Sequence, residues 1–129
     1  MEEPLRLSPA IRIFLCDDVP ELRALLRYGL QEDPGLEVVG EAGDALAGIK
    51  AVAQLRPDVV LLDLSMPGMD GLEAIPLMRE ASPESVIVVF SGFAADRMRD
   101  TALELGAARY MEKGEPLERV REVVRELAG

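Results

Sequence analysis

The chain has 129 residues, of which 49% are apolar and 29% are charged, and its formal net charge at pH 7 is −10. This length suits one compact domain, and a domain this acidic repels phosphate backbones, which excludes direct nucleic-acid binding. The chain has no histidine and one cysteine, Cys16, so it can form no histidine-type or cysteine-type metal site, no internal disulfide and no phosphohistidine of its own.

Five short apolar runs predict β-strands, which begin near residues 11, 36, 58, 86 and 109. Segments with helical periodicity follow them, opening at Pro20, after Asp44, after the loop 65–71, at Ala94 and at Pro116. We expect Asp18 and Asp44 to cap the first two helices. The side chains expected to face the core from the five helices are Leu22, Leu25, Leu26 and Leu30; Leu46, Ile49 and Val52 or Ala53; Leu72, Ile75 and Met78 or Leu77; Met98, Ala102 and Leu105; and Leu117, Val120, Val123, Val124 and Leu127.

The alternation of strands and helices indicates an α/β fold, in which a parallel sheet carries helices on both faces. The runs 59–62 and 86–90 are apolar throughout, as strands buried on both faces are. We assign residues 11–129 to the domain and 1–10 to an N-terminal extension. No apolar run approaches the ~20 residues of a membrane span, and the first residues lack a signal-peptide pattern. We therefore expect a cytoplasmic domain with no membrane partner.

Reactive side chains occur where the predicted strands end. Asp17 and Asp18 follow the first strand, Asp63 follows the third, Ser91 ends the fourth, and Lys113 comes just after the fifth. Ligands of such sheets bind at the carboxyl ends of the strands, so we expect these groups to lie close together. Carboxylates packed side by side repel one another unless a cation joins them, and Mg²⁺ prefers oxygen ligands. The pattern therefore predicts a Mg²⁺ site.

Several motifs at these strand ends occur together in one order: Asp17-Asp18, Asp63 with the loop 66–71 behind it, Ser91-Gly92, Gly106-Ala107, Tyr110 and Lys113. In this order they resemble the receiver domain of two-component response regulators. The resemblance covers the chain from about Ile11 to Leu127. It implies a doubly wound (βα)5 fold of the flavodoxin-like type, with five parallel strands in the order 2-1-3-4-5.

The resemblance also implies a role for each acid. Asp63 would be the phosphoacceptor, whose carboxylate attacks a phosphoryl group and becomes an aspartyl phosphate. Asp18 and Asp63 would bind Mg²⁺ directly, together with the backbone carbonyl of Ser65, and Asp17 would bind it through water. The donor would be a phosphohistidine on a sensor histidine kinase or a phosphotransfer protein, since the chain itself has no histidine.

Three further residues are implied to stabilise or transmit the phosphorylated state. Lys113 would pair with the phosphoryl oxygens, and Ser91 would donate a hydrogen bond to one of them. Tyr110 would then turn inward and repack the face made by the fourth helix, the fifth strand and the fifth helix. This face is the expected surface for a partner or for a weak or phosphorylation-dependent homodimer. Its basic residues are Arg97, Arg99, Arg109, Arg119, Arg121 and Arg125.

Departures from the commonest receiver pattern refine this prediction. Lys113 is followed by Gly114 where many receivers have proline, which resembles receivers joined to helix-turn-helix output domains. The chain would then be a stand-alone receiver or a fragment of such a regulator. Phe93 is expected to shield the acyl phosphate from water.

Two alternatives to a phosphoacceptor module remain open. Asp63 could be the nucleophile of a Mg²⁺-dependent phosphatase, although Ser65 stands where such enzymes carry a general acid. The chain could also be a degenerate receiver that binds a partner without phosphorylation, although the acids and the lysine are all present. We expect a regulatory domain and not an enzyme that turns over a separate substrate.

Overall fold

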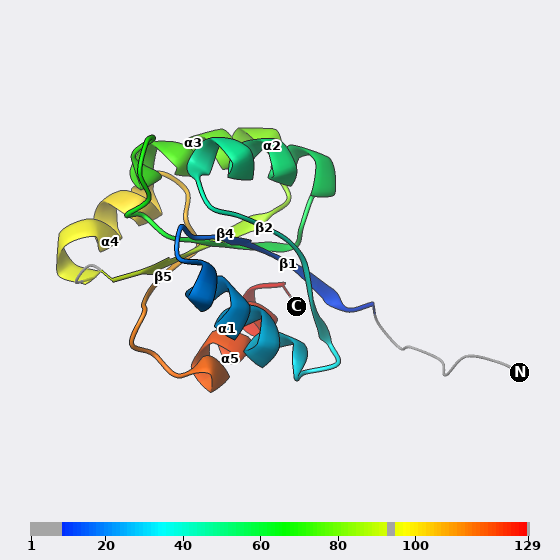
Figure 1. The fold of residues 1–129 in the computed structure, drawn as a ribbon. Coiled ribbons are helices and arrows are strands. Elements are labelled where there is room, and N and C mark those ends of the chain that lie inside the picture. The colour runs from blue at the N-terminus through cyan, green and yellow to red at the C-terminus, as the bar shows by residue number, and fades with distance from the viewer. Residues whose placement is uncertain (1–8, 93–94, 129) are drawn as a thin grey trace, which may run out of the picture.

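The computed structural model describes residues 9–92 and 95–128, in which five strands alternate with five helices (Figure 1). The strands are β1 (Ile11–Cys16), β2 (Leu36–Ala42), β3 (Val59–Leu62), β4 (Val86–Ser91) and β5 (Arg109–Glu112). The helices are α1 (Pro20–Gln31), α2 (Ala45–Leu55), α3 (Gly71–Ala81), α4 (Ala95–Glu104) and α5 (Leu117–Ala128). Every predicted strand and helix is present. No helix in these described ranges is long and apolar enough to cross a membrane.

The five strands form one parallel sheet in the order β2-β1-β3-β4-β5, which confirms the predicted topology. Figure 1 shows α2 and α3 over one face of this sheet and α1 and α5 over the other. Side chains alternate along each strand between two cores, so Phe14 and Val60 pack toward α2 and α3, and Ile13 and Val59 pack toward α1 and α5. All four residues of β3 are buried, because both of its faces are covered.

One of the two predicted helix caps is confirmed and the other is wrong. The carboxylate of Asp44 accepts a hydrogen bond of 2.8 Å from the backbone N–H of Ala47, so Asp44 caps α2. Asp18 does not cap α1: the N-cap is Val19, and no described side chain caps this helix. Pro20 stands at the first position of α1 and has no N–H to satisfy, which reduces the need for a cap.

Most of the predicted inward-facing side chains are buried or half-buried, and of the open alternatives Val52 and Met78 face the core. Three leucines contradict the prediction because they are exposed: Leu25, Leu46 and Leu105. At the start of α2 the buried residues Ala45 and Gly48 are small, and a Cβ added to Gly48 would lie 2.7 Å from the sulfur of Cys16. A leucine side chain does not fit between two elements that approach this closely.

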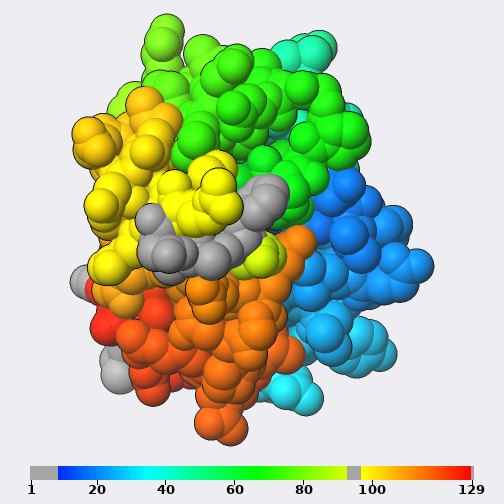
Figure 2. Space-filling view, turned by 90° about the vertical axis from the view of Figure 1, so that its left-hand side faces the viewer, coloured from blue at the N-terminus to red at the C-terminus, as the bar shows by residue number. Residues whose placement is uncertain are grey.

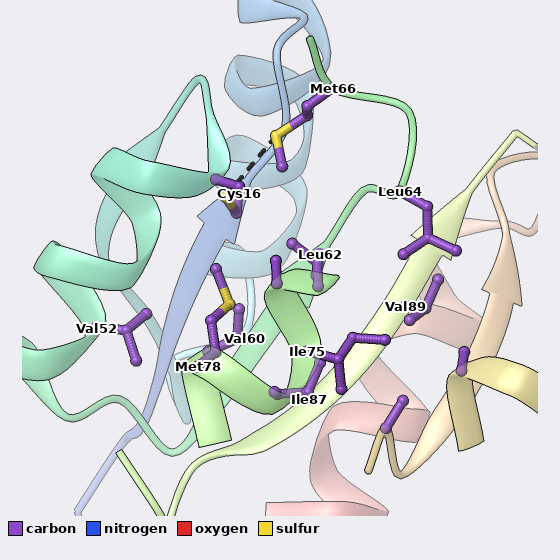
Figure 3. Close-up of a cluster of buried hydrophobic side chains, with 14 of the residues drawn as sticks. Cys16, Val52, Val60, Leu62, Leu64, Met66, Ile75, Met78, Ile87 and Val89 are labelled. Atoms are coloured by element: carbon purple, nitrogen blue, oxygen red, sulfur yellow. Dashed lines mark hydrogen bonds between the residues drawn. The ribbon is translucent and has the colours of Figure 1, made fainter. Parts of the chain in front are cut away.

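Cys16 lies in the core between the sheet and the pair α2 and α3 (Figure 3). Its side chain is fully buried, and its sulfur lies 3.6 Å from the carbonyl oxygen of Asp44 and 3.9 Å from the sulfur of Met66. Burial raises the pKa of the Cys16 thiol to about 12, and the negative charges of Asp44, Asp17 and Asp63 act in the same direction. The thiol therefore stays protonated at neutral pH.

We expect native Cys16 to resist alkylation. At about pH 8 iodoacetamide should label the folded protein far more slowly than the unfolded chain in guanidinium chloride, because the thiolate is the nucleophile and the folded core keeps it both protonated and covered. Intact mass after timed quenching measures the two rates. Equal rates would show that the sulfur is accessible and ionised in the folded state.

Candidate functional site

Three carboxylates from two neighbouring strands meet at the carboxyl edge of the sheet. Strands β1 and β3 pair with each other, so the residues that follow them, Asp17, Asp18 and Asp63, lie side by side. The backbone N–H of Asp63 donates to the carbonyl of Cys16 at 2.9 Å, which extends the strand pairing as far as the site. In Figure 2 the β1–α1, β3–α3 and β5–α5 segments, in blue, green and orange, come together on one face.

The predicted acid cluster is present and is crowded. One carboxylate oxygen from each of Asp17, Asp18 and Asp63 lies within 4.8 Å of the others. Asp17 and Asp63 are 3% and 2% exposed, whereas Asp18 is exposed to solvent. Buried carboxylates at this separation destabilise one another unless positive charge joins them. The donor set consists of hard oxygen atoms, which suits a divalent cation such as Mg²⁺.

The two oxygens of the Asp63 carboxylate have different surroundings. Its Oδ1 accepts hydrogen bonds from the backbone N–H and the hydroxyl of Ser65, at 3.2 and 3.1 Å. Its Oδ2 is buried and accepts no hydrogen bond from any residue that the structure describes. The ammonium of Lys113 lies 3.4 Å from this oxygen. Asp63 is therefore fixed in orientation while one oxygen keeps its lone pairs available.

Lys113 joins the acids as the sequence predicts. Its Nζ lies 2.9 Å from Oδ2 of Asp17, and its backbone N–H donates to the carbonyl of Ser91 at 2.8 Å. Burial alone would lower the pKa of Lys113, but the hydrogen bond to Asp17 and the charges of Asp63 and Asp17 outweigh it and raise the pKa. The side chain therefore remains a cation at neutral pH.

The Lys113→Met variant is expected to be less stable than the wild type in metal-free buffer by about 1 kcal/mol, after allowance for solvent screening. Folding raises the pKa of Lys113, so its contribution is complete below about pH 10.4, the ordinary lysine value, and is lost as the pH rises through the folded value. Urea unfolding at several pH values should show a constant difference up to about pH 9 that shrinks once the pH exceeds the ordinary lysine value. Lys50→Met, an exposed position on α2, is the control and should show neither effect. A difference that grows with pH would contradict this sign.

Ser91 lies at a buried position on β4, which pairs with β3, and Tyr110 lies at a buried position on β5, which pairs with β4. Ser91 is the last residue of β4 and is fully buried. Tyr110 on β5 is 8% exposed and belongs to the core that packs against α2 and α3. Its side chain is therefore already inward in this structure. Phe93, the predicted shield of the acyl phosphate, lies outside the described residues.

Two arginines that the sequence assigns to the face of α4, β5 and α5 contact α1 or the turn that follows it. Arg121 donates a hydrogen bond of 2.7 Å to the carbonyl of Gly29, and Arg125 pairs with Asp33. The reason is that α5 packs beside α1, where carbonyl oxygens near the end of the helix attract cations. These contacts place both side chains on the side of α5 that faces α1 and the turn after it.

Sequence patterns do not single out Arg23, yet its side chain lies against the site. Its Nη1 donates to the backbone carbonyl of Asp17 at 2.5 Å, and its Nε donates to Glu41 of β2 at 2.8 Å. The apolar periodicity of α1 does not distinguish Arg23 from Arg27, one turn later on the same helix. Only the three-dimensional structure shows that Arg23 reaches the acids.

Comparison with known proteins agrees with this arrangement. The family profile of the response regulator receiver domain matches residues 13–125. The nitrate/nitrite response regulator protein NarL of Escherichia coli (strain K12) is 44% identical over 101 residues, which cover 78% of this chain and 47% of NarL. A protein-glutamate methylesterase/protein-glutamine glutaminase of Koribacter versatilis is 41% identical over 111 residues, 84% of this chain and 30% of that protein. The signal receiver domain of NarL from Mycobacterium tuberculosis has a TM-score of 0.88 at 29% identity and covers 94% of this chain and 98% of its own.

The strand order and the acidic site at the carboxyl edge of the sheet define a flavodoxin-like receiver fold. The match over residues 13–125 shows that the chain belongs to the response regulator receiver domain family, the receiver domains of two-component systems. The chain spans less than half the length of either curated relative, NarL of Escherichia coli or the methylesterase of Koribacter versatilis.

Proposed function

We propose that this domain is a phosphoacceptor, in which Asp63 takes a phosphoryl group from a phosphohistidine of a sensor histidine kinase or a phosphotransfer protein. The observation that carries the proposal is the buried Oδ2 of Asp63, which lies 3.4 Å from Nζ of Lys113 and has no hydrogen-bond donor in the described part of the chain. A carboxylate that is oriented but not saturated with donors can act as a nucleophile. The neighbouring ammonium can neutralise charge on the incoming phosphoryl group.

The proposed transfer follows from these positions. A carboxylate oxygen of Asp63 forms a bond to phosphorus as the P–N bond to the donor imidazole breaks. The imidazole leaves with the electron pair and takes a proton from solvent. Lys113 pairs with the phosphoryl oxygens, and Ser91 donates a hydrogen bond to one of them. The domain is a regulator that carries the phosphoryl group and not an enzyme that turns over a separate substrate.

The acid cluster is suited to Mg²⁺, because three carboxylate oxygens lie within 4.8 Å of one another and the buried oxygen of Asp63 has no donor among the described residues. We assign Asp18 and Asp63 as direct ligands, the backbone carbonyl of Ser65 as a third ligand, and Asp17 as a ligand through water. Bound Mg²⁺ would supply positive charge that offsets the negative charge of the transferring phosphoryl group.

The proposed output is a change in the face made by α4, β5 and α5, transmitted through Ser91 and Tyr110. Because Tyr110 is already buried here, phosphorylation would stabilise this inward position rather than create it. The face would then bind a partner or form a weak or phosphorylation-dependent homodimer. The Lys113-Gly114 pair supports a receiver, residues 11–129, that works in the cytoplasm with a helix-turn-helix output domain.

Intact-mass measurement tests the phosphoacceptor proposal. The protein is incubated with Mg²⁺ and acetyl phosphate, and one phosphoryl group is expected to accumulate. EDTA or the Asp63→Asn substitution should abolish the addition, whereas Asp70→Asn, which removes an acid outside the cluster, should not. Release of inorganic phosphate without accumulation would contradict the proposal in favour of a phosphatase. The absence of any reaction would contradict it in favour of a degenerate receiver.

A further inference from the structure

Arg23 connects the acid cluster to the edge strand of the sheet. It lies on α1, and its guanidinium makes two hydrogen bonds in different directions. Nη1 donates to the backbone carbonyl of Asp17 at 2.5 Å, and Nε donates to Oε1 of Glu41 at 2.8 Å. The side chains of Arg23 and Glu41 are 19% and 25% exposed, so the ion pair is largely shielded from water. A shielded, two-point guanidinium contact fixes geometry more firmly than a surface ion pair does.

The polar groups of Asp17 are held by different partners. Oδ1 accepts the backbone N–H of Val19 at 2.9 Å, and Oδ2 pairs with Lys113 at 2.9 Å. The carbonyl oxygen, which belongs to the peptide bond between Asp17 and Asp18, is the group that Arg23 holds. That peptide is planar, so its orientation sets the direction in which the chain enters Asp18.

Asp18 depends on this peptide for its position. Its side chain is exposed and does not cap α1. Within residues 9–92 and 95–128 no hydrogen bond to its carboxylate is found. Its carboxylate oxygen nevertheless lies within 4.8 Å of those of Asp17 and Asp63. The backbone orientation at the Asp17–Asp18 peptide is therefore what brings this oxygen into the cluster.

We propose that Arg23 is a positioning residue for Mg²⁺ binding: it ties the Asp17–Asp18 peptide to Glu41 and thereby aims the carboxylate of Asp18 at the metal site. This inference rests on the proposed function, because it takes the acid cluster to be a Mg²⁺ site. The charge of Arg23 acts in the opposite direction, since a cation beside the site repels Mg²⁺. Removing the side chain therefore weakens Mg²⁺ binding if positioning dominates and strengthens it if charge dominates.

Isothermal titration calorimetry of the full chain with Mg²⁺ separates the effect of positioning from the effect of charge. We expect Arg23→Ala and Arg23→Lys each to weaken Mg²⁺ binding roughly tenfold, because lysine keeps the charge but cannot reproduce the two-point contact. Arg27→Ala is the matched control, since Arg27 pairs with the same Glu41 and no hydrogen bond or ion pair joins it to Asp17 in the described ranges. This control should bind Mg²⁺ like the wild type.

A second measurement distinguishes positioning from a general loss of structure. Phosphoryl incorporation from acetyl phosphate is followed at increasing Mg²⁺ concentration. The Arg23 variants should need more Mg²⁺ for half-maximal rate and should reach the wild-type maximum. A reduced maximum at an unchanged Mg²⁺ requirement would overturn the inference.

Other outcomes are equally decisive. Unchanged or tighter Mg²⁺ binding by Arg23→Ala would overturn the inference, as would full recovery of affinity in Arg23→Lys. If Arg23→Ala fails to fold by circular dichroism, the Arg23→Lys variant provides the same comparison. If the wild type binds Mg²⁺ and accumulates phosphate, and the Arg23 variants do so equally well, the role of Arg23 is contradicted and the proposed function is not. A wild type that does neither contradicts the proposed function as well.

Discussion

The Asp63→Asn variant is expected to accept no phosphoryl group and, in metal-free buffer, to be more stable than the wild type. The amide lacks the charged nucleophilic oxygen, yet its Oδ1 can still accept the two hydrogen bonds that Ser65 donates. The repulsion from Asp17 and Asp18, whose oxygens lie within 4.8 Å, disappears with the charge. Removal of this repulsion, offset in part by loss of the ion pair with Lys113, is expected to raise the free energy of unfolding by about 1 to 3 kcal/mol.

Mg²⁺ should reverse this order of stability, because ligand that binds only the folded state stabilises it by mass action and the wild type has the complete set of acids. Urea unfolding with EDTA and with Mg²⁺ measures the effect. Asp70→Asn removes the same charge at the N-cap of α3, where asparagine caps equally well, so it should keep wild-type stability and the wild-type response to Mg²⁺. A metal-free Asp63→Asn protein that is less stable than the wild type would show that charge crowding does not dominate at this position.

The sheet and the acid cluster are predictable because their signals are local in the sequence. A central strand such as 86–91 is buried on both faces, so nearly every one of its positions is apolar and the run stands out. Once the strands are placed, the rule that ligands bind at their carboxyl ends brings Asp17, Asp63 and Lys113 together without any measured distance. The structure places these three side chains in contact, as this reasoning predicts.

Contacts of long polar side chains are not predictable in this way. Arg23 and Arg27 occupy successive turns of α1, and only the fold decides that Arg23 lies toward Asp17. The apolar periodicity of α5 predicts which of its side chains are buried, but it does not predict that the guanidinium of Arg121 donates a hydrogen bond to α1. That contact depends on the packing of α5 beside α1, which the periodicity of neither helix specifies. Leu46 is exposed although its spacing predicts burial. The residue that faces β1 from this part of α2 is Gly48, whose lack of a Cβ allows the helix to approach the strand closely.

The Gly71→Ala variant is expected to be less stable than the wild type by about 1 to 3 kcal/mol, although alanine is the better helix former. Gly71 is the first residue of α3, and a Cβ there would lie 2.4 Å from Cα of Leu64 and 2.7 Å from its carbonyl oxygen. Both are backbone atoms of a buried residue, so the contact is relieved only if the loop after β3 shifts. Since Leu64 directly follows Asp63, the shift should also slow phosphoryl incorporation from acetyl phosphate.

Gly114→Ala is the matched control for the glycine at the start of α3. Apart from Gly114 and its two chain neighbours, no atom of the described residues lies within 4 Å of a Cβ added to Gly114, which follows Lys113. This substitution should leave stability unchanged or raise it by up to about 1 kcal/mol, because it restricts the unfolded chain. Urea unfolding compares the two variants. If Gly71→Ala is as stable as the wild type or more stable, the close approach of α3 to Leu64 is contradicted. If Gly71→Ala lowers the stability and Gly114→Ala raises it, backbone packing, and not helix propensity, fixes α3 against the loop that carries Asp63.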